Sequence, residues 1–312
     1  MSIHETNVIR DPEAQWLRLR QRVPAAHREA LEAAFHLAAR VHCGQKRKAR
    51  SDSEGAPYIL HPLRVARIML EEWDRCEPEV LAVCLLHDVI EDCPPLLRDI
   101  IEREIERVEG SDVLDAVIAL TKPRLPSAVP PDVKAARDAR YFRVLFNSSP
   151  WVRMVKCADR VDNLRDARVW GDLGFWERYS SETIGWHLYL ARQTAPITEV
   201  ALFKALVEGE RELRGRVPVW ADGRIIDPLA ARLVPENIAR QFGLIGLARR
   251  GETLLLGVHN NQEADAALLA LRTALQPVPN APTKIESIPL SDDALQDALT
   301  AGLFGEIEAP LD

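Results

Sequence analysis

Apolar residues recur three and four positions apart from Pro24 to about Glu210, and this spacing predicts that the first two thirds of the chain are helical. In residues 29–42 the apolar positions fall on one helix face. Residues 80–86 are continuously apolar and follow Pro78, a residue that the first turn of a helix tolerates, so we expect a deeply buried helix there. The segments that we interpret as helices are Glu29–His42, Pro62–Trp73, Val80–Leu86, Ile100–Leu120 and Trp151–Val169.

The pattern changes in two places further along the chain. Thr121–Lys134 contains four prolines and no periodicity, which predicts a long exposed loop. Residues 213–226 contain turn residues on both sides and are interpreted as a linker. Beyond them, short helical and strand-like segments alternate, which is typical of a small α/β module. They are a helix ending at Gly243, a hairpin in residues 244–258, a helix over Gln262–Leu275, a strand in residues 284–290, and a helix over Ser291–Leu303 with a serine N-cap.

These patterns predict a mainly α fold. We expect an all-helical domain in residues 1–212, the linker in residues 213–226, and a small α/β domain in residues 227–312. The length of 312 residues is sufficient for two ordinary domains. The composition, 47% hydrophobic and 28% charged, is typical of a globular protein.

The overall charge of the chain argues against nucleic acids and anionic membranes as partners. The formal net charge is −7, whereas a protein that binds nucleic acid or an anionic membrane surface usually carries a basic surplus. The first residues lack the pattern of a secretion signal, no apolar run reaches the length of a membrane span, and the five cysteines show no C-x-x-C spacing. We therefore expect a cytoplasmic protein that binds neither nucleic acid nor membrane. A small anionic ligand needs only a local basic pocket and is still allowed.

The most informative segment is LAVCLLHDVIED. Its apolar start predicts a buried helix, yet its end carries four polar residues within about one and a half turns. Helical spacing places Glu91 on the same side as His87 and Asp88. Ionised carboxylates are costly in an apolar setting unless they are paired or bind a metal, so this concentration of charge favours a divalent cation. The alternative is a helix end at the surface, with Glu91 and Asp92 simply exposed.

Two further segments supply possible ligands. His61 stands before a proline at the start of an amphipathic helix, although a single histidine there is more often structural. In WVRMVKCADRVDNLRD, Asp159 and Asn163 share a helix face, whereas Asp162 points partly elsewhere and is expected to pair with Arg165 or solvent. The resulting mixed imidazole–carboxylate set suits Mn²⁺, Fe or Zn²⁺. Its members are His61, His87, Asp88 and Asp159.

A basic run precedes His61 and consists of Lys46, Arg47, Lys48 and Arg50. Taken alone, such a run is more often a solvated loop. It can also attract a polyphosphate, and a guanidinium can stack on a base. Beside a metal site, the run becomes a candidate clamp for a nucleotide substrate.

The motifs AARVHCGQKRKARSDSEGAPYILHP, LLHDVIED, LTK and VKCADRVDNLRD are more specific in combination. In this order they resemble the hydrolase domain of the Rel/Spo alarmone enzymes and their small stand-alone relatives, which belong to the HD superfamily. The resemblance extends from about Glu29 to Gln193. It implies an all-helical fold and Mn²⁺-dependent removal of the 3′-pyrophosphate from (p)ppGpp, with another divalent metal as an option.

The resemblance also implies residue roles. The metal would be held by His61, His87, Asp88 and Asp159. Glu91 and Asp92 would activate the attacking water and support charge at the reacting phosphorus. Arg47 and Lys48 would line the nucleotide site, and Asn163 would contact the ribose.

Three departures from the family affect the substrate prediction. The region between Gln45 and Pro57 is a few residues longer than the family loop, Cys93 stands where relatives often have threonine, and the stretch after Lys122 is rich in proline. We find no segment that resembles a synthetase domain. The sequence therefore predicts hydrolysis without alarmone synthesis.

Residues from about Asp227 to Gly305 resemble the N-terminal domain of type II secretion and pilus assembly ATPases. The resemblance rests on LVPENIARQFGLIGLARRGETLLLGV, the helix after it and SDDALQDAL. No Walker A sequence follows, so we do not interpret the chain as a secretion ATPase. A regulatory role, or docking of a protein partner, is the expected function of this module.

Two alternatives to an alarmone hydrolase stay open from the sequence. The same metal site could act on another nucleotide, such as a 3′-phosphorylated adenine nucleotide. The chain could also be a non-catalytic protein that senses a nucleotide and reports through its C-terminal module. The carboxylates Glu91 and Asp92 favour an enzyme, because a sensor has less need of a group that activates water.

Overall fold

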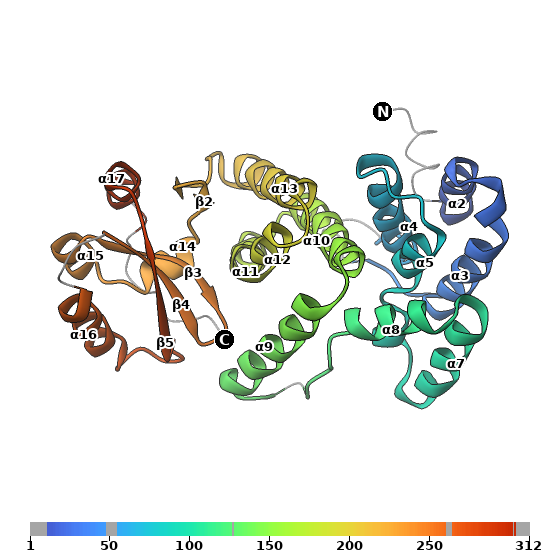
Figure 1. Cartoon of the computed structure of the whole chain (residues 1–312), viewed down its shortest axis with the longest axis horizontal. Helices are drawn as coiled ribbons and strands as arrows, with labels where there is room; N and C mark the ends of the chain where they lie inside the picture. Colours follow the sequence, from blue (N-terminus) through green and yellow to red (C-terminus); the bar gives the residue numbers. More distant parts are fainter. Residues whose placement is uncertain (1–10, 48–54, 127, 260–263, 302, 304–312) are drawn as a thin grey trace. The chain divides into compact units, whose positions relative to one another are not determined.

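The computed structural model describes residues 11–47, 55–126, 128–259, 264–301 and 303 (Figure 1). The chain forms two compact units, and each unit draws on separated stretches of sequence. The first comprises Met1–Arg124, Arg143–Gly171 and Leu190–Leu202, and the second comprises Leu125–Phe142, Asp172–Tyr189 and Phe203–Asp312. The sequence-based borders at residues 212 and 227 stay a prediction.

The described part of the first unit is built from helices, so the prediction of a mainly α fold is confirmed. Within the described residues, no helix is both long enough and apolar enough to cross a bilayer. The elements that lie wholly in this unit are α2 (Pro12–Arg22), η1 (Ala25–His27), α3 (Arg28–Val41), α4 (Leu60–Arg67), the π-helical turn η2 (Ile68–Glu72), α5 (Pro78–Leu86), α6 (Val89–Asp92), η3 (Pro95–Leu97), α7 (Arg98–Glu109), α8 (Ser111–Leu120) and α10 (Pro150–Trp170).

Helix α5 occupies the centre of the first unit. It begins at Pro78, and every residue from Val80 to Leu86 is buried, which agrees with the continuous apolar run in the sequence. It packs against α3, α4, α8 and α10. Because α5 is enclosed on all these sides, the residues at its C-terminal end are delivered into the interior of the unit.

Three local features differ from the sequence interpretation. The helix expected over Ile100–Leu120 is divided into α7 and α8 at Gly110, whose φ of 90° favours glycine. The expected loop Thr121–Lys134 is shorter, because helix α9 (Pro131–Asn147) already begins at Pro131. Helix α2 lies before the predicted helical region and is anchored by Trp16, which stacks on Phe35 with ring centroids 4.7 Å apart.

The second unit contains a small three-stranded sheet in the order β3-β4-β5. Strands β3 (Leu244–Arg250) and β4 (Thr253–Val258) are antiparallel, as the predicted hairpin requires, and β5 (Lys284–Pro289) runs parallel to β4 after helix α16 (Ala264–Leu275). A side chain at Gly246 would collide with the carbonyl oxygen of Ala230, so glycine permits this close approach of α14 to β3. The remaining elements of this unit are α11 (Leu173–Glu182), the π-helical turn η4 (Thr183–His187), β1 (Trp220–Ala221), β2 (Arg224–Ile225), α14 (Pro228–Arg232), α15 (Glu236–Phe242) and α17 (Asp292–Thr300).

The predicted linker and the predicted C-terminal elements can be placed on this structure. Strands β1 and β2 pair as a short antiparallel hairpin inside residues 213–226. The expected helix end at Gly243 and the Ser291 N-cap of α17 are both confirmed. Helices α9, α12 (Leu188–Arg192) and α13 (Pro196–Arg214) each have residues in both units.

The burial of Asp227 in the second unit should make the stability of the protein depend on pH. It caps α14, accepting hydrogen bonds from Leu229 N at 3.0 Å and from Ser181 Oγ at 2.6 Å, and burial raises its pKa to about 6. The stabilising contribution of the protonated form is present below the unfolded-state pKa and is lost as pH rises through about 6. We expect Asp227→Asn, which keeps a polar cap, to be more stable than the wild type at pH 8 by about 3 kcal/mol and to lose this advantage near pH 4. Chemical denaturation at the two pH values measures this difference, and an advantage that does not depend on pH would contradict it.

Candidate metal centre

Four predicted ligand residues come together in the interior of the first unit. His61 lies in the first turn of α4, His87 and Asp88 form the turn between α5 and α6, and Asp159 lies in α10. The Nε2 atoms of the two histidines are 3.3 Å apart. Asp88 Oδ2 is 3.2 Å from His87 Nε2 and 3.6 Å from His61 Nε2. Asp159 Oδ1 lies 3.1 Å from His61 Nε2 and 3.8 Å from His87 Nε2.

These donor atoms fit a divalent transition metal. One ligand atom each from His61, His87 and Asp88 lie within 4.8 Å of one another. The two Nε2 atoms face each other and the same two carboxylate oxygens, so a cation among them could bind both nitrogens and both oxygens. A set of two imidazoles with carboxylate oxygens suits Mn²⁺, Fe or Zn²⁺.

Outer hydrogen bonds fix the orientation of the two imidazole rings. The Nδ1 atom of His87 lies 2.8 Å from Cys84 O, and the Nδ1 atom of His61 lies 2.7 Å from Asp162 Oδ2. If both Nδ1 atoms donate, each Nε2 atom is left with a lone pair directed at the cluster. Partners of this kind raise the basicity of a metal-binding histidine and hold its ring in place.

Asp159 is surrounded by hydrogen-bond donors. Lys156 Nζ donates to its Oδ2 at 2.8 Å, and Asn163 Nδ2 donates to its Oδ1 at 2.5 Å. Burial alone opposes ionisation, but Lys156 and the neighbouring His61 and His87 outweigh it and hold the pKa of Asp159 well below its usual value. Asp159 is therefore a carboxylate at neutral pH, the form that binds a metal.

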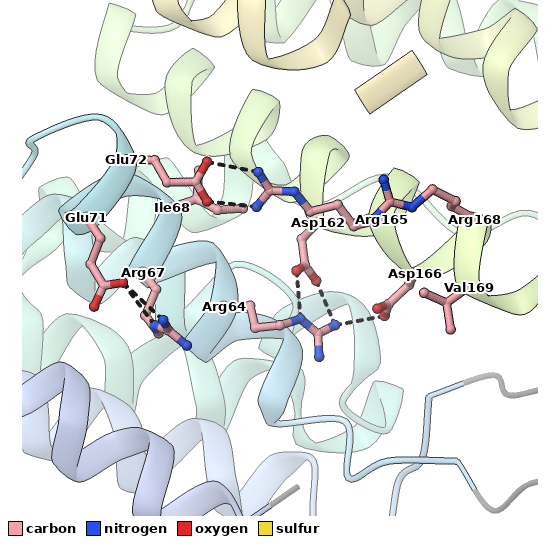
Figure 2. Close-up of a pocket in the computed structure, with 10 residues that line it drawn as sticks. All are labelled: Arg64, Arg67, Ile68, Glu71, Glu72, Asp162, Arg165, Asp166, Arg168 and Val169. Atoms are coloured by element: carbon pink, nitrogen blue, oxygen red, sulfur yellow. Dashed lines mark hydrogen bonds and ion pairs between the residues drawn. The ribbon is translucent and has the colours of Figure 1, made fainter. Parts of the chain in front are cut away.

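The structure corrects the interpretation of Asp162. The sequence suggested that it pairs with Arg165 or solvent, but its side chain is buried and receives two hydrogen bonds from Arg64, at 2.7 and 2.8 Å. Arg165 binds Glu72 instead, at 2.8 and 2.9 Å (Figure 2). The reason is that Asp162 faces α4 across the helix packing, which the spacing within α10 alone does not reveal.

The two proposed catalytic carboxylates have different surroundings. Asp92 is partly exposed, with Oδ2 3.6 Å from His42 Nδ1 and Oδ1 3.5 Å from Arg124 Nη2. Burial, followed by the negative charge of Asp88, raises the pKa of Asp92 above its usual value. Glu91 accepts a hydrogen bond from the backbone N–H of Lys122 at 2.9 Å, so it is tied to the segment that follows α8.

The proposed nucleotide-binding residues are only partly described. Arg47 donates to Asn163 Oδ1 at 2.6 Å and to Asp166 Oδ2 at 3.0 Å, and its guanidinium lies over the Tyr58 ring, 5.3 Å from the centroid. Arg47 and Asn163 thus lie together beside Asp159. Lys48 is outside the described residues.

Several residues of this site were not identified from the sequence. Tyr58 donates to Asp88 Oδ2 at 2.8 Å and packs on the buried ring of His42, with centroids 4.7 Å apart. Tyr58 stands three residues before His61, and this spacing was the one available signal for it. The others are Arg64, Lys156 and Asp166, which are charged residues one helical turn from a predicted site residue.

Comparison with known proteins defines the class. A family model described as an HD domain matches residues 34–173, a span that contains all four candidate ligands. The adjacent pair His87 and Asp88 lies within this span, and together with His61 it forms the group that could hold a metal ion.

Individual proteins with similar sequences show which HD-domain proteins this chain resembles. Guanosine-3′,5′-bis(diphosphate) 3′-pyrophosphohydrolase MESH1 of Homo sapiens is 36% identical over 159 residues, which are 51% of this chain and 80% of that protein. The guanosine-3′,5′-bis(diphosphate) 3′-pyrophosphohydrolase of Vibrio cholerae is 35% identical over 139 residues, 44% of this chain and 18% of that protein. A solved structure, described as a metazoan ortholog of SpoT that hydrolyzes ppGpp, covers 61% of this chain and 98% of its own, with 25% identity and a TM-score of 0.47. The chain belongs to the family of HD-domain hydrolases that includes MESH1.

The geometry predicts which carboxylate controls metal binding. We expect Asp88→Asn to weaken the binding of Mn²⁺ to the full chain by more than about 100-fold, since even outer partners of metal ligands are worth roughly 10- to 100-fold. Asp115→Asn, at an exposed position on α8, is the matched control and should bind Mn²⁺ like the wild type. Titration calorimetry with Mn²⁺ measures both. Equal affinities for the two variants would show that Asp88 is not a ligand.

Proposed function

We propose that this chain is a Mn²⁺-dependent hydrolase that removes the 3′-pyrophosphate from guanosine alarmones, (p)ppGpp. The observation that supports this most strongly is the convergence of His61, His87, Asp88 and Asp159 in one buried cluster. The names of the relatives point to the same substrate, because MESH1 and the Vibrio cholerae protein are both named guanosine-3′,5′-bis(diphosphate) 3′-pyrophosphohydrolases.

In this proposal the four clustered side chains hold the metal. A divalent ion supplies Lewis-acid chemistry, which acidifies water and neutralises phosphoryl oxygens. The chain itself supplies a preorganised set of ligands, since Lys156 and Asn163 fix Asp159 and the outer hydrogen bonds fix the two rings. No large rearrangement of these side chains is then needed when the site is loaded.

Asp92 is the proposed general base. It lies one helical turn from Asp88, and its raised pKa makes it a better proton acceptor than an ordinary aspartate. His42 and Arg124 flank its two oxygens, so a proton accepted there stays next to polar groups. Glu91 is proposed to support charge at the reacting phosphorus, while its bond to Lys122 N holds its carboxylate in place.

Arg47 is the proposed contact for the base and phosphates of the nucleotide. Its guanidinium is held by Asn163 and Asp166 and supported by the Tyr58 ring. A guanidinium fixed in this way can present its remaining face to a planar base, or its donors to phosphate. Asn163 is proposed to contact the ribose, and Lys48 is proposed to bind the nucleotide.

Residues 227–312, within the second unit, are proposed to form a regulatory or docking module. The proposal rests on its resemblance, in sequence, to the N-terminal domain of type II secretion ATPases. Its three-stranded sheet and flanking helices α15, α16 and α17 are the elements on which this resemblance falls. We propose that this module docks a protein partner. We also propose that the chain hydrolyses alarmones and does not synthesise them.

The substrate proposal has a direct test. Full-length protein incubated with Mn²⁺ and ppGpp should release pyrophosphate, with activity lost on addition of a chelator and restored by excess Mn²⁺. A 3′-phosphorylated adenine nucleotide and GTP serve as competing substrates in the same assay. Absence of ppGpp turnover over a range of divalent metals would reject the proposal, and tight binding of ppGpp without turnover would indicate a sensor.

The role of Asp92 predicts a particular pH dependence. Because only ionised Asp92 accepts a proton, kcat should fall at acid pH, with a midpoint above the ordinary aspartate value of about 3.9. Asp92→Asn should lower kcat by about 10²- to 10⁴-fold, remove this acid limb and leave the affinity for Mn²⁺ unchanged. Glu106→Gln, at an exposed position on α7, is the control for loss of one carboxylate. An acid limb that persists in Asp92→Asn assigns the base to another group.

A further inference from the structure

Seven side chains of the first unit, four of them candidate site residues, form a closed ring of hydrogen bonds and ion pairs. Two of its members, His61 and Asp159, are candidate metal ligands, and two others, Arg47 and Asn163, are proposed to bind the nucleotide. Its contacts are His61–Asp162 at 2.7 Å, Asp162–Arg64 at 2.7 Å, Arg64–Asp166 at 2.8 Å, Asp166–Arg47 at 2.9 Å, Arg47–Asn163 at 2.6 Å, Asn163–Asp159 at 2.5 Å and Asp159–His61 at 3.1 Å.

Two residues link the metal side of the ring to the nucleotide side. Asn163 joins Asp159 to Arg47, and Arg64 joins Asp162 to Asp166. The Nε and Nη2 atoms of Arg64 bind both oxygens of Asp162, and Nη2 also binds Asp166 Oδ2 at 2.8 Å (Figure 2). Asp162 in turn orients His61, and Asp166 in turn holds Arg47. Arg64 thus reaches a metal-side residue and a nucleotide-side residue through one carboxylate each.

The arrangement depends on the shape of the guanidinium. Asp162 is 3% exposed, and a carboxylate at that depth needs a partner that offers two parallel donors. The planar fork of an arginine can bind one carboxylate through two nitrogens and still donate to a second, whereas a lysine offers a single point of charge. Arg64 is 32% exposed and lines a surface cleft of about 270 Å³, so it joins the buried cluster to the surface.

We infer that Arg64 is a positioning residue that couples occupancy of the metal centre to binding of the nucleotide by Arg47. In the described part of the chain, its hydrogen bonds go to Asp162 and Asp166 and to none of the four candidate ligands. It acts by fixing Asp162, and therefore the His61 ring, together with Asp166, and therefore the Arg47 guanidinium. The nucleotide half of this inference rests on the proposed function. Because one guanidinium holds both carboxylates, a change at Arg64 is expected to affect both binding events.

The same cleft offers a matched control in Arg67. It lies one turn further along α4, and its guanidinium binds Glu71 at 3.1 Å and Gln15 Oε1 at 3.1 Å, with no interaction drawn from it to Asp162 or Asp166 in Figure 2. We expect Arg64→Gln to weaken Mn²⁺ binding to the full chain by roughly 10- to 100-fold and to raise KM for ppGpp as well. Arg67→Gln should change neither quantity. Calorimetry with Mn²⁺ alone gives the first value, and steady-state kinetics at saturating Mn²⁺ gives the second.

Two more variants separate the halves of the ring. Asp166→Asn should raise KM for ppGpp and leave Mn²⁺ affinity at the wild-type value, because it interrupts the nucleotide side alone. Arg64→Lys should show both effects, each smaller than in Arg64→Gln, since an ammonium keeps the charge but cannot hold two carboxylates in the same geometry. If Arg64→Gln does not fold, as judged by thermal unfolding, Arg64→Lys carries the test.

The inference and the proposed function fail in different ways. A wild-type chain that binds Mn²⁺ but does not hydrolyse ppGpp rejects the proposed function, and the Mn²⁺ titrations still decide the metal side of Arg64. If Arg64 variants match Arg67→Gln in Mn²⁺ affinity, or change Mn²⁺ affinity without any effect on KM in an active enzyme, the coupling role of Arg64 is wrong.

Discussion

The first unit depends on compensation of ionisable groups that are buried in an apolar helical interior. Moving a carboxylate or an imidazolium out of water costs several kcal/mol unless a partner replaces the lost hydration. Helix α5 is enclosed by apolar neighbours, yet it ends in His87 and Asp88, and α10 contributes Asp159 and Asp162 to the same interior. Each of these groups has a partner at hydrogen-bond distance, and the arrangement of those partners determines the geometry of the whole site.

The compensating cations come from α10 itself and from α4. Lys156 lies one turn before Asp159 and binds it directly, whereas Asp162 is compensated by Arg64 from α4. The two aspartates therefore have separate cations and share His61 between them. This separation leaves the oxygens of Asp159 near the metal cluster, while both oxygens of Asp162 are occupied by Arg64. A ligand and an outer support are thus distinguished by their partners, although the residues are of the same type.

The sequence predicted well what is encoded locally. The continuous apolar run predicted the buried helix α5, and the polar residues that follow the run predicted a site at its end, at His87 and Asp88. The contact between Arg64 and Asp162 joins residues 98 positions apart, and no local spacing reports it. The break at Gly110 was missed for a different reason, because the apolar periodicity on both sides is helical and one residue with positive φ interrupts it. The placement of the four candidate ligands in one cluster was expected from chemistry, but their distances required the fold.

The carboxylates of the site separate into two groups by their electrostatic surroundings, and this separation supports a division of labour. Neighbouring histidines, Lys156 or Arg64 outweigh burial and lower the pKa of Asp88, Asp159 and Asp162. Asp92 lacks a strong cationic partner of this kind among the described residues, since Arg124 is 3.5 Å away, and burial with the charge of Asp88 raises its pKa. Groups whose pKa values are moved apart by their environment can take opposite roles in one reaction. The low-pKa carboxylates suit a permanent negative role beside a metal, and Asp92 suits the reversible uptake of a proton.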